Sequence, residues 1–145
     1  MEAVICDTVH GRDEFAALPD GLKKRFICDA RATVAVQSKR SEDFARIYRR
    51  LREKGLSPLV VKGISCRRLW KNPDARPSGD EDLLIRPEWL GDVLAVMEEN
   101  GFAVSREGDV VCYSPLSGLT VEIHTSLFPT DSEYFSGFNG CFDRV

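Results

Sequence analysis

The chain has 145 residues, of which 43% are hydrophobic and 30% charged, a composition typical of folded globular proteins rather than disordered ones. This length predicts one compact domain. No apolar run approaches the roughly eighteen residues of a transmembrane helix, and the N-terminus lacks the features of a signal peptide. Five scattered cysteines and two histidines do not form a zinc-binding pattern. We therefore expect a cytoplasmic protein with free thiols and no membrane partner.

The formal net charge is only −3, but the charges are unevenly distributed. Residues 22–71 contain fifteen Lys/Arg and four Asp/Glu, a net charge of +11, which leaves −14 for the other residues. This asymmetry is compatible with a surface that binds a polyanion. The favoured interpretation is a solvated basic helix face beside an acidic, metal-binding half of the chain.

The first 55 residues are expected to be helical. A short helix is expected around Glu14–Leu18, and 22–36 also favours a helix. A clearer helix follows, with Gly55 at its end and one apolar stripe formed by Phe44, Ile47, Tyr48 and Leu51. Three basic residues lie off this stripe: Arg46, Arg49 and Arg50. They could contact RNA, or pair with Glu42 and Glu53 four residues away.

From residue 56 onward the pattern alternates between strands and helices. Strands are expected at Leu59–Val61, Asp80–Ile85, Phe102–Val104, Val110–Tyr113 and Leu119–Ile123. A short helix is expected at Arg67–Trp70, an irregular loop at 71–79, and a helix from Pro87 to Gly101. The last segment, from Ser132 to Val145, starts a helix or loop that stops abruptly, which predicts a fragment of a longer chain. This order predicts an α/β or α+β sheet domain (56–145) preceded by an N-terminal helical segment (1–55) packed on it.

The run Gly79-Asp80-Glu81-Asp82-Leu83-Leu84-Ile85 is the sharpest chemical feature. Alternate residues of a strand share a face, so we expect Asp80 and Asp82 to project together into a solvent cleft, where Mg²⁺ or Mn²⁺ would relieve their repulsion. In Val121-Glu122-Ile123-His124 the same alternation places Glu122 and His124 on one face. If the two strands are neighbours, Glu122 completes a carboxylate triad able to hold two metals. His124 could equally serve only as a hydrogen-bonding partner.

A second feature lies upstream, where a strand ends in Lys62-Gly63-Ile64-Ser65. Glycine lets a backbone approach phosphate closely, and helix N-termini offer unpaired N–H groups. Arg67, Arg68 and Arg76 are available to neutralise phosphate charge. Trp70 is expected to pack in the core or at a helix end.

The segment from LVVKGISCRRLW through GDEDLLI to GF and VEIH, about residues 40–128, resembles a largely uncharacterised bacterial nucleotidyltransferase family of the polymerase-β-like superfamily. The resemblance implies a small mixed β-sheet core flanked by helices. It assigns Asp80, Asp82 and Glu122 as catalytic metal ligands, and Lys62, Gly63, Ser65, Arg76 and His124 to nucleotide binding. The sequence departs from the family pattern at Ile64 and at Glu81, where an apolar residue is usual. A charged Glu81 must be exposed or paired, as on a half-covered strand.

The resemblance implies transfer of a nucleoside monophosphate from a nucleoside triphosphate to an acceptor hydroxyl, with release of pyrophosphate and with Mg²⁺ or Mn²⁺ as cofactor. The acceptor is left open among RNA, a protein and a small molecule. Two other functions also remain open. One is a non-catalytic nucleotide-binding or antitoxin-like regulatory module of the same fold, and the other is a metal-dependent glycosyltransferase that uses D-x-D.

Overall fold

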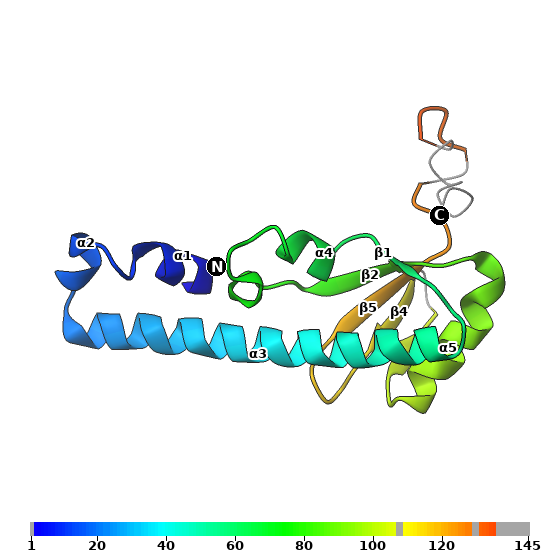
Figure 1. Cartoon of the computed structure of the whole chain (residues 1–145), viewed down its shortest axis with the longest axis horizontal. Helices are drawn as coiled ribbons and strands as arrows, with labels where there is room; N and C mark the ends of the chain where they lie inside the picture. Colours follow the sequence, from blue (N-terminus) through cyan, green and yellow to red (C-terminus); the bar gives the residue numbers. More distant parts are fainter. Residues whose placement is uncertain (1, 107–108, 129–130, 136–145) are drawn as a thin grey trace.

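The computed structural model, which describes residues 2–106, 109–128 and 131–135, contains a five-stranded sheet packed against helices (Figure 1). Helices α1 (Glu2–Val9) and α2 (Asp13–Ala16) lead into α3 (Asp20–Glu53), which runs along the body of the molecule (Figure 1). The other elements are β1 (Leu59–Val60), α4 (Ile64–Arg67), η1 (Pro73–Ala75), β2 (Asp80–Leu84), η2 (Pro87–Trp89), α5 (Leu90–Glu99), β3 (Ala103–Ser105), β4 (Val110–Tyr113) and β5 (Thr120–His124).

The sheet has the strand order β1-β2-β5-β4-β3 and is mixed. Strands β2 and β5 are parallel, whereas the other three neighbouring pairs are antiparallel. A parallel pair needs a crossover connection, which η2, α5, β3 and β4 supply here. The predicted mixed sheet with flanking and preceding helices is therefore confirmed.

The main core lies between one face of the sheet and the helices α3 and α5. Helix α3 contributes its predicted stripe through Phe44, Ile47 and Leu51, and the strands contribute residues such as Leu83 and Val121, all almost inaccessible to solvent. Burial of this apolar area is the dominant force that holds the sheet on the helices. Because side chains alternate along a strand, the residues between these core positions on β2 and β5 point to the opposite face.

The helices differ from their predictions in three respects. The two expected helical segments form one helix, α3, because no glycine or proline interrupts 22–53. Helix α1 was not predicted, since it packs through small residues: Ala3 and Cys6 lie against Ala30 and Ala75. Helix α4 begins at Ile64 rather than Arg67, directly after the turn at Gly63. None of the helices in the described ranges combines the length and apolar character of a membrane crossing.

Elsewhere the differences are small. The expected irregular loop at 71–79 includes the 3-10 turn η1, and Pro87 opens the 3-10 turn η2 that leads into α5. Of the segment expected to continue from Ser132, residues 136–145 lie outside the described ranges, and residues 133–135 form a turn.

Asp43 joins α3 to the turn between β4 and β5. Its Oδ2 accepts hydrogen bonds from Ser114 Oγ at 2.7 Å and Ser117 Oγ at 2.6 Å, while Oδ1 accepts one from Arg46 Nε at 3.1 Å. Burial raises the pKa of Asp43, but the hydrogen bonds from the two serines and Arg46 outweigh it, so that the pKa lies below its ordinary value. The ionised form of Asp43 therefore stabilises the fold.

We expect Asp43→Ala to lower the free energy of unfolding at pH 7 by about 2 kcal/mol, the scale of hydrogen bonds to a charged group. A carboxylate with a depressed native pKa stabilises the fold above its unfolded pKa of about 3.9, and this stabilisation is lost as the pH falls through the native pKa. The difference between wild type and variant should therefore shrink below about pH 4. Urea unfolding between pH 7 and 3 measures it, with the exposed Glu42→Ala as control. A difference that stays constant over this range would contradict the assignment.

Candidate functional site

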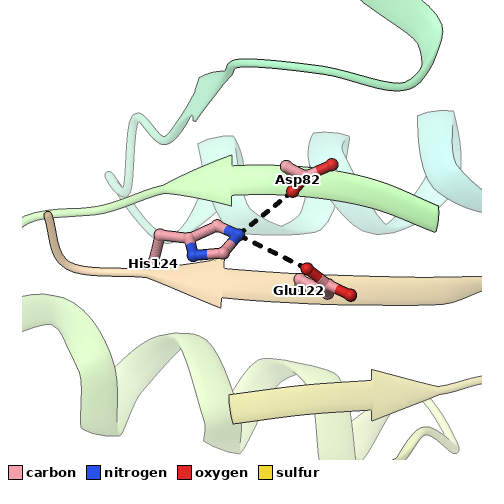
Figure 2. A group of neighbouring side chains, drawn as sticks. All are labelled: Asp82, Glu122 and His124. Atoms are coloured by element: carbon pink, nitrogen blue, oxygen red, sulfur yellow. Dashed lines mark hydrogen bonds and ion pairs between the residues drawn. The ribbon is translucent and has the colours of Figure 1, made fainter. Parts of the chain in front are cut away.

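The candidate site lies on the face of β2 and β5 opposite the main core. The register pairs Asp82 with Glu122 directly across the two parallel strands, and places His124 two residues further along β5. Their side chains converge (Figure 2): His124 Nε2 lies 3.1 Å from Asp82 Oδ1 and 3.7 Å from Glu122 Oε2. One ligand atom from each of the three residues lies within 4.8 Å of the others. The parallel pairing thus brings together the acids that the sequence places forty residues apart.

Lys62 adds a positive charge to this group. The main chain next to β1 is bonded to β2, since the Val61 N–H donates to the Asp82 carbonyl at 3.0 Å. This contact brings Lys62 Nζ to 2.9 Å from Asp82 Oδ1 and 3.8 Å from Asp80 Oδ2. The hydrogen bond to Asp82 is the main reason that the pKa of Lys62 is raised. The lysine therefore stays charged and offsets part of the negative charge of the acids.

Asp82 is far less exposed than the sequence predicts. Both aspartates were expected to face a solvent cleft, but the Asp82 side chain is only 4% exposed, against 35% for Asp80. That expectation is wrong for Asp82 because Lys62 and His124 both lie against its Oδ1. Its other oxygen, Oδ2, is buried and has no hydrogen-bond partner among the described residues. A buried carboxylate oxygen without a partner is costly, and a bound cation is a natural partner for it.

The donors present fit a hard divalent cation. Asp80, Asp82 and Glu122 offer carboxylate oxygens, the ligands that Mg²⁺ and Mn²⁺ prefer. Burial, and then the negative charges of Asp80 and Asp82, raise the pKa of Glu122, a repulsion that a cation would relieve. The imidazole of His124 suits Mg²⁺ less well than carboxylate does, and its observed contact is the one with Asp82.

On the core face of β2, between the two aspartates, Glu81 forms a buried ion pair with Arg67. The two residues are 1% and 0% exposed, and Arg67 Nη2 lies 2.5 Å from Glu81 Oε1. The second oxygen of Glu81 accepts a hydrogen bond from the Ile64 N–H. Although these contacts lower the pKa of Glu81, burial outweighs them and raises it. Glu81 is therefore paired, as its charge requires, but the expectation of a half-covered strand is wrong.

The same network extends to α3 and η1. Arg67 Nη1 lies 3.0 Å from Ser41 Oγ and 3.3 Å from Asp74 Oδ1. Asp74 also accepts hydrogen bonds from the hydroxyls of Ser38 and Ser41. Arg67 was considered in the sequence only as a phosphate ligand, and its complete burial directs it to Glu81 and Asp74 instead. The only signal for this role was the charged residue between two aspartates, which needed a partner.

Gly63 is required by this arrangement. Its φ is +68°, and a Cβ at this position would lie 2.1 Å from Glu81 Oε2 and 2.9 Å from the Asp80 carbonyl oxygen. The Ile64 N–H, at the start of α4, is directed to Glu81. Gly63 thus allows the β1–α4 loop to approach β2 closely, whatever further contact the loop makes.

Two other residues expected to bind nucleotide make contacts away from the acids. The Ser65 hydroxyl donates to the Val60 carbonyl at 3.1 Å. The Arg76 guanidinium lies 5.9 Å from the centre of the Trp70 ring, a cation–π contact. Trp70 follows α4 and is 47% exposed, so it is not part of the core. Of the predicted nucleotide-binding side chains, the structure therefore brings Lys62 and His124 to the acids, but not Ser65 or Arg76.

We expect Gly63→Ala to lower the free energy of unfolding by at least about 2 kcal/mol, through strain at a positive φ and overlap with Glu81. Gly79→Ala is the matched control, because nothing lies within 4 Å of a Cβ there. Thermal or urea unfolding of both variants measures the difference. Equal stability of the two variants would show that the loop does not need glycine for its packing.

We expect Arg67→Met to lower the free energy of unfolding by about 3–5 kcal/mol, because it leaves the Glu81 charge buried without its partner. The double variant Arg67→Met/Glu81→Gln should regain part of this loss, since glutamine is neutral and can still accept the Ile64 N–H. The exposed neighbour supplies a control, Arg68→Met, which should change stability by less than about 0.5 kcal/mol. A double variant no more stable than Arg67→Met would argue against the ion pair as the cause.

Comparison with known proteins agrees with this geometry. A family described as uncharacterised nucleotidyltransferase matches residues 2–145, which is nearly the whole chain. No curated protein and no solved structure matches the chain significantly. The match includes both acidic strands, the loop at Gly63 and the N-terminal helices. The chain belongs to this uncharacterised nucleotidyltransferase family.

Proposed function

We propose that the protein is a metal-dependent nucleotidyltransferase that transfers a nucleoside monophosphate from a nucleoside triphosphate to an acceptor hydroxyl, with release of pyrophosphate. One observation carries this proposal: Asp82 lies opposite Glu122 on parallel strands and keeps a buried oxygen without a partner in the described part of the chain. Membership of a nucleotidyltransferase family supports the same reaction class.

The proposal gives each residue of the site a separate task. Asp80, Asp82 and Glu122 would hold Mg²⁺ or Mn²⁺, which when bound would neutralise phosphate charge and polarise the reacting phosphoryl group. Lys62 is the cationic side chain best placed to contact the triphosphate, because its ammonium already lies at the acids. His124 would orient Asp82 through their 3.1 Å contact.

Three other residues would also bind phosphate, and two of their side chains would first have to leave their present contacts. Gly63 and Ser65 would bind phosphate through their backbone, and Arg76 through its guanidinium. For its side chain to bind phosphate, Ser65 would have to leave the Val60 carbonyl, and Arg76 would have to leave the Trp70 ring. Lys62 needs no comparable rearrangement of the loop.

In the proposed reaction, the acceptor oxygen attacks the α-phosphorus and the bond to pyrophosphate breaks. The hydroxyl proton needs an acceptor, and Glu122 is suited to this because its pKa is raised and its side chain is 30% exposed. The chain itself would contribute mainly alignment and charge neutralisation. The acceptor can be RNA, a protein or a small molecule, and the acids alone do not distinguish among them.

We also propose a cytoplasmic location, in which cysteines remain reduced. Within the described ranges, Cys6, Cys28, Cys66 and Cys112 are free thiols, as the sequence predicts. Cys141 lies outside those ranges.

The central test is whether Asp82→Asn or Glu122→Gln removes Mn²⁺-dependent binding of nucleoside triphosphates and the release of pyrophosphate. Each variant should weaken metal-dependent binding at least tenfold, about 1.4 kcal/mol, while the exposed Glu88→Gln should match wild type. Calorimetric titration measures binding, and labelled nucleotides screened with Mg²⁺ or Mn²⁺ measure pyrophosphate.

The outcomes separate the candidate functions. Unchanged Mn²⁺ affinity in a folded Asp82→Asn variant would exclude the metal site. Triphosphate binding by the wild type without pyrophosphate release over the acceptor classes would support the non-catalytic module. Turnover of a nucleotide-sugar would instead support a glycosyltransferase.

A further inference from the structure

A groove of about 460 Å³ lies between α3, β1 and α4, away from the acids. Its walls include the apolar or aromatic side chains of Phe44, Tyr48 and Ile64. Its rim carries three guanidinium groups, contributed by Arg49 and Arg52 from α3 and by Arg68 just after α4. We call this the arginine groove. Its volume falls within the range of small-molecule sites, about 300–1,000 Å³.

The charge of the arginine groove is not balanced within it. None of its described lining residues is acidic. Two neighbouring arginines of α3 have acid partners: Arg46 pairs with Asp43, and Arg50 pairs with Glu53 at 2.9 Å. Within the groove, Arg52 donates to the neutral hydroxyl of Ser57, its one side-chain partner among the described residues.

The other two guanidinium groups have even fewer contacts. In the described part of the chain, neither Arg49 nor Arg68 has a side-chain hydrogen bond or an ion pair, and both side chains are exposed. Three neighbouring cations without a carboxylate repel one another, and an anion relieves that repulsion. Of the three arginines expected from the sequence to reach a polyanion, only Arg49 is therefore available, because Arg46 and Arg50 are paired.

We propose that the arginine groove binds the phosphate group of a nucleotide, as a ligand separate from the triphosphate at the acids. Guanidinium groups bind phosphate through paired hydrogen bonds. Several guanidinium groups around one site match the charge of a phosphate better than they match the single charge of a carboxylate. The partly exposed ring of Tyr48 offers a surface for a flat base. The phosphate can belong to a free mononucleotide or to the end of a strand.

The arginine groove and the acidic site share no residue but adjoin the same loop. Val60, Ile64 and Ser65 line the groove, whereas Lys62, between them, reaches Asp82. Binding in the groove should consequently need no divalent metal. This inference goes beyond the proposed function, because it can hold or fail whether or not pyrophosphate is released.

The test measures binding of adenosine monophosphate to the full chain by calorimetry in EDTA. We expect Arg49→Gln/Arg68→Gln to weaken binding at least tenfold, and Arg49→Lys/Arg68→Lys to lose less. The matched control is Arg50→Gln, which removes the adjacent but paired arginine of the same helix and should bind like wild type. Asp82→Asn should also bind like wild type in EDTA, which separates this site from the acids.

Further probes identify the part of the ligand that is recognised. Adenosine without phosphate should bind at least tenfold more weakly than adenosine monophosphate, and inorganic phosphate should compete with it. A 5′-phosphorylated oligoribonucleotide that also competes would identify a strand end as a source, whereas failure to compete would identify a free nucleotide. No binding by the wild type in EDTA, equal binding by the glutamine double variant, or equal binding of adenosine would overturn the proposal.

Discussion

The ion pair between Arg67 and Glu81 joins parts of the chain that lie far apart in the sequence. Both partners have left water, so each is stable only while the other is present. Through Arg67 the pair connects α4 with Ser41 of α3 and with Asp74 of η1. Through Glu81 it fixes the middle of β2 and the first N–H of α4. Four elements therefore depend on one pair of charges.

This dependence reaches the candidate site through the alternation of β2. Glu81 points to the core face, so Asp80 and Asp82 on either side of it must point to the other. The loop that approaches Glu81 at Gly63 is also the loop that brings Lys62 to Asp82. The buried ion pair and the acidic site thus lie on opposite faces of the same strand, β2. A substitution that disturbs the ion pair should therefore also change the positions of the acids.

The parts that the sequence predicted are those governed by local periodicity. A period of two identified β2 and β5 and grouped Asp80 with Asp82 and Glu122 with His124, while a period near 3.6 identified the stripe that α3 buries. The prediction of a carboxylate triad assumed that β2 and β5 are neighbours, and the structure pairs them in parallel. Periodicity could not reveal the partner of Glu81, because Arg67 lies fourteen residues away in a short helix with no pattern. It also missed α1, whose contacts use alanine and cysteine rather than large apolar residues.

Helix α3 has a mechanical consequence. Its 34 residues correspond to a rod about 51 Å long, at about 1.5 Å per residue. The rod is held near its middle, where Ser38 and Ser41 bond to Asp74. One arm carries α1, and the other carries Phe44, Ile47 and the arginine groove. Because long helices bend only gently, α3 sets a nearly fixed distance between α1 at one end and the main core at the other, on which the acidic strands are packed.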